Sequence, residues 1–505
     1  MKISYLSTKT CALILAFSLV TSCTGQSSLD AENKSTKSTS EKAKAEKIDD
    51  LLRFYSKNAG FNGSVLVAHQ NELVYKNGFG MANWEWDIPN DQDTKFRVAS
   101  ITKQFTAMLI LQLASENKLD LHTPISNYLP DYPKKNAEQI TIHQLLNHSS
   151  GTPETDEFIR FRDMERNRYK PEDIMKIFSD GELEFTPGSK FKYSNSGYII
   201  LGVIIEKITR KSYEKVLQEN IFEPLEMNNS GYDHNTSLLK NRASGYRSLF
   251  GKHKYLNANY IDMTVPYSAG SIYSTVEDLF LWDQALYTEK LLPKTYRDLL
   301  FEKYIPARDR HYGYGWFIGE IPIGKSGDNI SGMHHGGGIN GFNTRITRIP
   351  SDGSLIVLLN NTSRAPLLEL TVAIVGILND KPFDLPKKSV ALALLDIIDK
   401  DGMDKGIQFF NEIKDDKSYY VKEQEMNNAS YELLQSNKEE HAAEVLKLGI
   451  SYFPNAFNLY DSYGEVLLKL GRENEAVDNY KKSVELNPNN KNGIRVLKEL
   501  GIEIK

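Results

Sequence analysis

The chain has 505 residues, of which 40% are hydrophobic and 25% are charged, and its formal net charge at pH 7 is −5. This length is sufficient for a large core and at least two folded domains. The negative net charge, the pI of about 6.1 and the absence of a long basic run in the sequence argue against nucleic acid as a partner.

The N-terminus has the pattern of a secretory signal. Lys2 and Lys9 precede an apolar stretch, Cys11 to Val20, that is too short to span a membrane comfortably. The following Thr21-Ser22-Cys23 completes a sequence that resembles a bacterial lipobox, cleaved just before the cysteine. Residues 1–22 are therefore expected to be a lipoprotein signal peptide and Cys23 to carry lipid. In the alternative, a plain secretory signal, the cysteine is incidental.

A lipid at Cys23 would hold the protein at a membrane of the bacterial cell envelope, in the periplasm or on the cell surface. No later apolar run in the sequence is long enough for a transmembrane helix, so anchoring is expected to depend on Cys23 alone. Cys11 lies in the segment to be removed, which leaves the mature chain without a disulfide. Residues 23–47 are rich in Ser, Thr, Lys, Glu and Asn and are expected to form a flexible tether.

Residues 48–380 combine strand and helix patterns. Gly63 to Ala68 and Leu73 to Tyr75 indicate an N-terminal hairpin. Later strands are expected over Tyr312 to Ile318, Phe342 to Ile349 and Leu355 to Leu359, and helices between them over Ile101 to Ser115, Ile199 to Thr209 and Ser274 to Leu286. Periodicity alone predicts no more than a mixed α and β domain.

Ser100-Ile101-Thr102-Lys103 is the first of three segments with the chemistry of a serine hydrolase. The Ser-x-x-Lys spacing recurs at four other places in the chain, so the spacing alone is weak evidence. Phe105, Leu109 and Leu113 follow Ser100 at helical spacing, which predicts that it lies at the first turn of a buried helix. The Lys103 amine would then share a face with the Ser100 hydroxyl and could activate it. The alternative is a capping serine followed by a solvated lysine.

The other two segments are Tyr193-Ser194-Asn195 and His335-Gly336-Gly337-Gly338. A phenol can act as a general acid or base, and a glycine run lets backbone N–H groups approach a substrate closely. Each segment also has an ordinary interpretation, as a turn or as a loop without a ligand.

Together with their surroundings these segments resemble the serine β-lactamase-like family of class C β-lactamases, DD-peptidases, D-amino-acid peptidases and related esterases. The likeness covers about residues 48–380 in the family's order. It is carried further by Thr141 to Gly151, Phe185 to Gly188, Ala269 to Thr275 with Asp278, Leu279 and Trp282, and His335 to Phe342. The resemblance implies an α+β fold in which the first and last strands join one antiparallel sheet, flanked by helices and a helical lobe.

The resemblance also implies a role for each motif residue. Ser100 would be the acylated nucleophile, Lys103 a base or proton relay, and Tyr193 a general base or acid whose phenolate Lys103 would favour. The backbone N–H groups of Ser100 and Gly338 would form the oxyanion hole. Asn195 would hold Lys103 and the substrate, and Gly336 and Gly337 would lie along the bound substrate. No cofactor is implied.

His335 departs from the β-lactamase pattern, which has a lysine at this position to meet a substrate carboxylate. A histidine is only partly charged near neutral pH, so His335 would attract such a substrate less, and this favours an esterase or a D-amino-acid-type peptidase over a true β-lactamase. In the alternative, His335 only hydrogen-bonds the loop. A catalytic metal is not expected, because the adjacent His334 would point to the opposite face of a strand.

Residues 381–505 are expected to form an all-α domain of tetratricopeptide-like repeats. Residues 457–490 fit the 34-residue pattern, and the same pattern is visible one period earlier. A third helix pair is expected over about Ser389 to Lys414 and a capping helix over Asn492 to Leu500. These repeats either extend the enzyme structurally or bind a protein partner.

The leading hypothesis is therefore a serine hydrolase of the bacterial cell envelope that forms an acyl-enzyme with an ester, an amide or a D-amino-acid peptide. Two alternatives remain at this stage. One is a β-lactamase or DD-carboxypeptidase, and the other is a non-catalytic binding or scaffold protein that uses the helical repeats.

Overall fold

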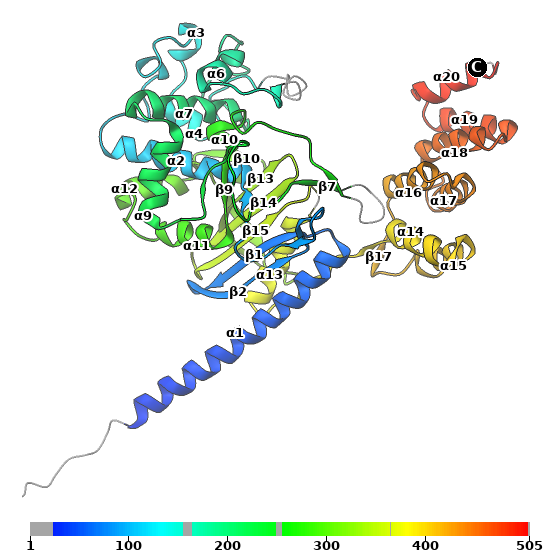
Figure 1. Cartoon of the computed structure of the whole chain (residues 1–505), viewed down its shortest axis with the longest axis horizontal. Helices are drawn as coiled ribbons and strands as arrows, with labels where there is room; N and C mark the ends of the chain where they lie inside the picture. Colours follow the sequence, from blue (N-terminus) through cyan, green and yellow to red (C-terminus); the bar gives the residue numbers. More distant parts are fainter. Residues whose placement is uncertain (1–23, 155–163, 249–254, 364, 503–505) are drawn as a thin grey trace, which may run out of the picture.

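The computed structural model describes residues 24–154, 164–248, 255–363 and 365–502 (Figure 1). The expected signal peptide, residues 1–22, and Cys23 lie outside these residues. The expected tether is helical in the structure, because α1 runs without a break over Thr24–Asn58. Residues 23–47 were expected to form a flexible tether because of their polar composition, but the helix continues into Ile48, Leu51, Leu52 and Tyr55, which recur at helical spacing and are buried.

An eight-stranded antiparallel sheet forms the centre of the first domain, and its first and last strands in the sequence are neighbours. The order is β10-β11-β12-β13-β14-β15-β1-β2, and β1 pairs with β15, where Ser64 lies opposite Leu359. The expected joining of the two ends of the domain in one sheet is confirmed. The strands are β1 Gly63–His69, β2 Glu72–Phe79, β10 Ile305–Ala307, β11 Arg310–Tyr312, β12 Phe317–Pro322, β13 Asn329–Ile339, β14 Phe342–Ile349 and β15 Ser354–Asn360.

Helices cover both faces of this sheet. Leu66 and Leu359 pack into one core with α2 (Thr102–Ser115) and α11 (Val276–Ala285). Val65 and Leu358 pack into a second core with α1 and α13 (Leu367–Leu378) on the opposite face. Successive strand residues point to opposite faces, so β1 and β15 are buried throughout, and their apolar runs reflect a sheet covered on both sides.

The helical lobe and its short strands lie between β2 and β10 in the sequence. Its helices are α2 Thr102–Ser115, α3 Lys134–Ala137, α4 Ile142–Leu146, α6 Pro171–Ser179, α7 Asn195–Thr209, α8 Tyr213–Leu217, α9 Glu223–Leu225, α10 Tyr267–Gly270, α11 Val276–Ala285 and α12 Lys294–Arg297. Its strands are β3 Met81–Asn83, β4 Ile88–Pro89, β5 Phe96–Arg97, β6 Gly231–Tyr232, β7 Tyr246–Ser248, β8 Tyr255–Asn257 and β9 Ile272–Ser274.

The strand expected over Tyr312 to Ile318 is instead two strands joined by a turn. β11 ends at Tyr312 and β12 begins at Phe317. Gly315 between them has φ +79°, a conformation that favours glycine and that ends an extended run. The aromatic residues alternate along this segment as in a strand, so the sequence pattern did not indicate the turn.

The C-terminal residues stack as helix pairs, as expected for tetratricopeptide-like repeats (Figure 1). α14 (Val390–Asp401) and α15 (Met403–Ile413) form the expected degenerate pair. They are followed by α16 Glu423–Gln435, α17 Glu439–Tyr452, α18 Phe457–Lys469, α19 Glu473–Leu486 and the terminal α20 Lys491–Glu499, with a short two-stranded sheet of β16 Lys388–Ser389 and β17 Tyr419–Tyr420 beside the first pair.

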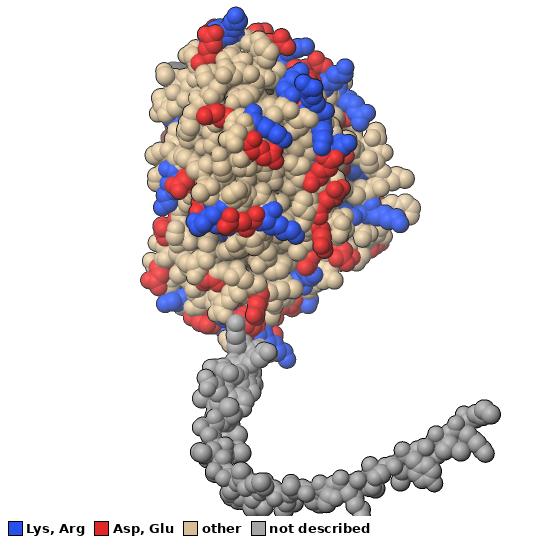
Figure 2. All heavy atoms as spheres, turned by 90° about the vertical axis from the view of Figure 1, so that its left-hand side faces the viewer, with Lys and Arg blue, Asp and Glu red and all other residues tan. Residues whose placement is uncertain are grey.

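The first domain presents a mixed surface. On the face drawn in Figure 2, basic and acidic side chains are interspersed among uncharged ones. Across the described parts of the chain, no helix is both long enough and apolar enough to cross a membrane.

Candidate active site

Ser100 lies in a tight turn at the entrance to α2. The 3₁₀ helix η1 (Ala99–Ile101) leads directly into α2, so Ser100 lies in this 3₁₀ turn, just before the α-helix, rather than in the first turn of the α-helix as expected. Ala99 has φ +50°, which is uncommon for a residue with a side chain and places strain next to the nucleophile. The turn is held because the Val98 N–H donates to Ile272 O at 2.9 Å. Ser100 is partly exposed and lines a cavity of about 770 Å³.

Lys103 is completely buried beside Ser100. Its Nζ lies 2.8 Å from Asn195 Oδ1, 2.8 Å from the carbonyl oxygen of Ala269 and 3.2 Å from Ser100 Oγ. Burial lowers the pKa of Lys103 from its ordinary value of 10.5 to about 7, and the carboxylate of Glu154 partly opposes this effect. A neutral amine has two N–H donors and one lone pair. The two carbonyl oxygens can accept the two donors, which leaves the lone pair for the Ser100 hydroxyl proton.

Tyr193 and Asn195 are placed by the start of α7. Ser194 is the N-cap, and its hydroxyl accepts a hydrogen bond from the Gly197 N–H at 3.0 Å. Tyr193 therefore precedes the helix and Asn195 begins it, which lets both side chains point at Lys103. The Lys103 Nζ lies 4.9 Å from the centre of the Tyr193 ring.

The protonation state of Tyr193 differs from the expectation. Burial raises the pKa of the Tyr193 phenol well above 10, although hydrogen bonding with Ser100 partly offsets the rise. The expectation that Lys103 favours a Tyr193 phenolate differs from this structure, because burial keeps the phenol protonated and only about half of the Lys103 amines are charged at pH 7. A neutral Lys103 amine can accept a proton in this setting, and a protonated Tyr193 phenol can donate one.

His148 supports Tyr193 and was missed as part of the site from the sequence. Its ring lies 4.3 Å from the Tyr193 ring, and its Nδ1 accepts a hydrogen bond from the Ser194 N–H at 3.0 Å. Burial lowers the pKa of His148, which keeps Nδ1 available as an acceptor. His148 also has φ +61°. Its place in Asn147-His148-Ser149-Ser150-Gly151 was noticed as a family motif, but nothing in that motif indicated a contact with Tyr193.

The glycine run lies on β13, beside Ser100. A Cβ on Gly337 would lie 2.2 Å from Val98 O and 2.3 Å from Thr344 Oγ1, so only glycine lets this strand approach the turn that carries Ser100. Gly338 lines the cavity and would have open space around a Cβ. The strand thus brings the Gly338 backbone to the same cavity as Ser100. Gly337 serves this approach, and neither Gly336 nor Gly337 lines the cavity.

His335 is placed behind the cavity rather than on its wall. It is 2% exposed, its Nε2 is 3.1 Å from the Tyr312 hydroxyl, and its Nδ1 is 2.7 Å from Gly336 O. Burial and the nearby Lys103 lower the pKa of His335 to about 3. The expectation that His335 is partly charged and meets the substrate differs from this structure, because the side chain is neutral and is bonded to the protein.

The cavity wall is apolar except for a few polar groups. Ile174, Ile177 and Phe178 of α6 line one part of it, and the carboxyl-bearing Glu154 and Glu165 line the cavity with them. Glu154 Oε1 accepts a hydrogen bond from the Ser196 N–H at 2.9 Å. Among the described residues that line this cavity there is no Lys or Arg.

The fold and this site define a serine hydrolase in which a buried lysine and a tyrosine flank the nucleophile. Residues 48–374 match the family model for β-lactamase, and the chain therefore belongs to the β-lactamase family. Residues 457–490 match the tetratricopeptide repeat model, which confirms the repeat expected there.

Known proteins similar to this chain are penicillin-binding proteins and related hydrolases. Penicillin-binding protein 4* of Bacillus subtilis (strain 168) is 29% identical over 366 residues, which cover 68% of this chain and 78% of that protein. A teichoic acid D-alanine hydrolase of Staphylococcus aureus (strain MRSA252) is 28% identical over 276 residues, 54% of this chain and 66% of that protein. The solved structure of a penicillin binding protein from Bacillus halodurans has 29% sequence identity and a TM-score of 0.57, covering 64% of this chain and 98% of that one.

Proposed function

We propose that this enzyme hydrolyses esters or amides of D-amino acids whose amino group is free. The observation that carries the catalytic part is the setting of Lys103, whose Nζ lies 2.8 Å from two carbonyl oxygens and 3.2 Å from Ser100 Oγ. In a neutral amine the two N–H groups can donate to the carbonyl oxygens, which leaves the lone pair for the Ser100 hydroxyl proton. This is the arrangement that general-base activation of a serine requires.

The proposed reaction has two steps. Lys103 accepts the Ser100 proton as Oγ attacks the substrate carbonyl carbon, and the N–H groups of Ser100 and Gly338 donate to the resulting oxyanion. The bond to the leaving alcohol or amine then breaks, with Tyr193 donating a proton to that group and recovering one from protonated Lys103. Water attacks the acyl-enzyme in the second step, loses its proton to the same pair of groups, and releases the acid and Ser100.

The preference for a free amino group rests on the charges of the cavity. Glu154 and Glu165 line it, no described Lys or Arg does, and the neighbouring His335 is neutral. An ammonium group would be attracted to this wall, whereas a substrate carboxylate would find no charged partner. The D configuration is supported by the similarity to a teichoic acid D-alanine hydrolase.

We also propose that the enzyme works in the bacterial cell envelope, held there by lipid on Cys23, with the helical repeats as a docking site for a protein partner. The named relatives support the location, since they include penicillin-binding proteins and a hydrolase of teichoic acid. Residues 1–22 would be removed as a signal peptide, residues 24–58 would connect the anchor to the enzyme, and residues 381–505 would form the repeat domain.

The test compares three esters that differ in one group each: D-alanine methyl ester, L-alanine methyl ester and N-acetyl-D-alanine methyl ester. Turnover is expected to be fastest for the first, and absent for all three in Ser100→Ala. Glu154→Gln is expected to reduce the preference for the free amine, while Glu277→Gln, a surface control in the same domain, is expected to leave it unchanged. Faster turnover of a cephalosporin or of an acyl-D-alanyl-D-alanine peptide would contradict the proposal and support the β-lactamase or DD-carboxypeptidase alternative.

A further inference from the structure

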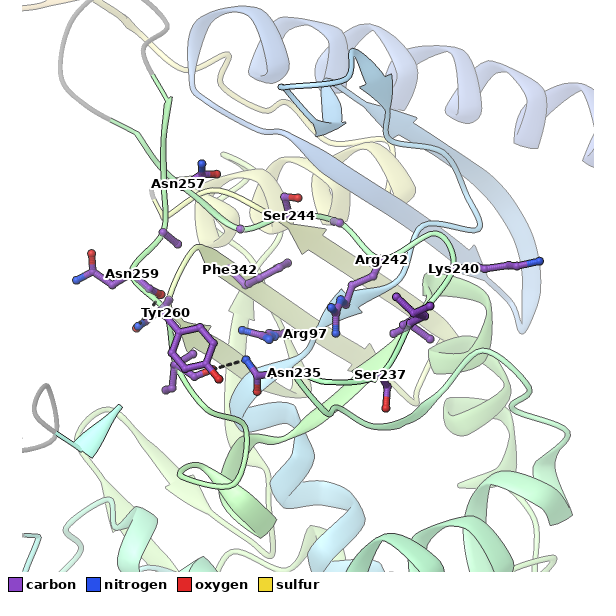
Figure 3. A pocket seen from close by; sticks show the side chains of 17 residues that line it. Arg97, Asn235, Ser237, Lys240, Arg242, Ser244, Asn257, Asn259, Tyr260 and Phe342 are labelled. Carbon is purple, nitrogen blue, oxygen red and sulfur yellow. Dashed lines mark hydrogen bonds between the residues drawn. The ribbon is translucent and has the colours of Figure 1, made fainter. Parts of the chain in front are cut away.

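A second pocket adjoins the catalytic cavity. It has a volume of about 570 Å³ and is formed by Arg97, most residues of the segment 235–245, residues 257–261, Asn340 and Phe342 (Figure 3). Ile261 and Asn340 line both this pocket and the catalytic cavity, so the two adjoin at these residues. Asn340 follows Ile339 at the end of β13 and is two residues beyond Gly338, which lines the catalytic cavity.

The pocket is electropositive. Arg97 and Arg242 both contact one carboxylate, Asp233, which is 1% exposed: Arg97 Nε lies 2.6 Å from Oδ2 and Arg242 Nη1 lies 2.8 Å from Oδ1. Two guanidinium groups against one carboxylate leave one positive charge in excess. Among the described residues that line the pocket there is no Asp or Glu to neutralise it.

The two guanidinium groups still have donors to offer. Within the described residues, Arg97 donates only from Nε, so its Nη1 and Nη2 groups make no hydrogen bond. In Figure 3 the guanidinium groups of Arg97 and Arg242 lie near each other inside the pocket, whereas the side chain of Lys240 points away from it. Asp233 fixes both groups, and this preorganisation reduces the entropy lost when they bind an anion.

The pocket is within reach of a bound substrate. Arg97 precedes Ser100 by three residues, so the two Cα atoms are at most about 11 Å apart along the chain. The acyl group under the proposed function is a single amino acid, which is too small to fill both spaces. A group in the second pocket would therefore belong to the leaving part of the substrate.

We infer that the Arg97–Arg242 pocket is a subsite for an oxyanion, phosphate or carboxylate, carried by the leaving alcohol or amine of the substrate. This inference rests on the proposed function for the identity of the leaving group, and on the pocket itself for the anion. The enzyme would then release D-amino acids from anionic carriers in preference to neutral ones.

The experiment compares D-alanyl esters whose alcohols end in a neutral hydroxyl, a phosphate or a carboxylate, each with linkers of two, four and six carbons. The wild type is expected to show a kcat/KM at least tenfold higher for one of the anionic series than for the neutral one, at the linker length that spans the two spaces. The series preferred identifies phosphate or carboxylate as the oxyanion. Equal values for all three series would overturn the inference.

Variants distinguish recognition of the anion in the pocket from attraction by the electrostatic field of the whole protein surface. Arg242→Gln is expected to reduce the anionic-to-neutral ratio of kcat/KM toward one. Asn259→Asp, a nearly isosteric change in an exposed residue that lines the pocket, is expected to do the same by adding a negative charge. Arg247→Gln removes the same charge as Arg242→Gln but from an exposed residue of β7 that does not line the pocket, and is expected to preserve the ratio. Equal loss in Arg247→Gln would mean that the field of the whole surface, not this pocket, selects the anion. That outcome would refute the inference.

A binding measurement that needs no turnover distinguishes failure of the proposed function from failure of the anion subsite. Four-carbon hydroxyalkyl phosphate is titrated into Ser100→Ala by calorimetry, with and without Arg242→Gln. If no D-alanyl ester is hydrolysed but the phosphate binds and loses affinity at least tenfold with Arg242→Gln, the anion subsite stands and the proposed acyl group is wrong. If the esters are hydrolysed but neither the phosphate nor the corresponding carboxylate binds, the subsite is refuted and the proposed function stands.

Discussion

The buried amine of Lys103 predicts how catalysis depends on pH. A change of pKa from 10.5 to about 7 corresponds to about 5 kcal/mol of differential stabilisation of the neutral amine. At pH 7 about half of the enzyme would carry a neutral Lys103, compared with roughly one molecule in 3,000 for an unperturbed lysine. Since the neutral amine is the base, kcat/KM is expected to rise with pH and to level off above an apparent pKa near 7.

The upper part of the profile reports on Tyr193. Its phenol must be protonated to donate to the leaving group, and burial raises its pKa well above 10. No fall in kcat/KM is therefore expected up to pH 10. The assay is the initial rate with N-acetyl-D-alanine methyl ester, which has no titrating amine, measured from pH 5 to 10 in buffers of constant ionic strength.

Glu154→Gln tests the electrostatic part of this reasoning. The carboxylate of Glu154 raises the pKa of Lys103, so its removal is expected to move the rising limb toward lower pH by a fraction of a unit. Glu277→Gln changes a surface carboxylate that is paired with Lys76, and should leave the limb in place. A rising limb that stays above pH 9 in the wild type, or that moves to higher pH in Glu154→Gln, would refute the assignment of Lys103 as the base.

Three further predictions concern positions where the packing leaves little freedom. Gly337→Ala is expected to lower kcat/KM at least 100-fold, because its Cβ would overlap Val98 O. Gly338→Ala has open space around its Cβ and should keep most of the stability of the folded protein. Rates and thermal melts of the two variants check this, and equal melting temperatures with equal rates would contradict it. Arg348→Met leaves Asp283 buried without its 2.8 Å ion pair, so the free energy of unfolding is expected to fall by about 3–5 kcal/mol. Urea unfolding measures the loss, and a change below 1 kcal/mol would mean that the pair is dispensable. Gly464→Val would press against the Tyr480 ring, which a Cβ already approaches to 2.8 Å. It should lower the helical content of the repeats on circular dichroism while small esters are still hydrolysed, and a parallel loss of activity would show that the two domains depend on each other.

Most of the site could be predicted because its residues lie in short motifs with fixed local geometry. Ser100 and Lys103 are one turn apart, and Tyr193 and Asn195 flank a helix cap, so each pair is set by a few backbone angles. The roles of the pairs were harder to assign. Whether Lys103 or Tyr193 holds the proton depends on how deeply segments far away in the sequence bury the two side chains. That burial cannot be predicted from the motifs themselves.

The fold shows the same division between local and distant information. The outer bounds of the α14–α15 pair, expected at about Ser389 and Lys414, lie one residue from the observed Val390 and Ile413, because repeats bury their faces against neighbours in sequence. The expectation of a flexible tether differs from the structure, because the composition of residues 23–47 was considered without the apolar residues that follow. The structure joins the two segments in one helix, α1. The contact of His148 with Tyr193 depends on a loop meeting α7 from outside, which neither segment specifies on its own.

The histidine at position 335 can be understood from the same electrostatics. Lys103 is desolvated, and a second cation behind it would lower its pKa further and raise the cost of protonating it during acylation. A neutral His335, held by Tyr312 and Gly336 O, avoids that cost and supports the strand that carries Gly338. The cavity then has carboxylates and no fixed cation on its described walls, while an excess of positive charge lies in the adjoining Arg97–Arg242 pocket. Under the proposed function, this separation would orient a substrate that has an ammonium group near its reacting carbonyl and an anion farther along its leaving group.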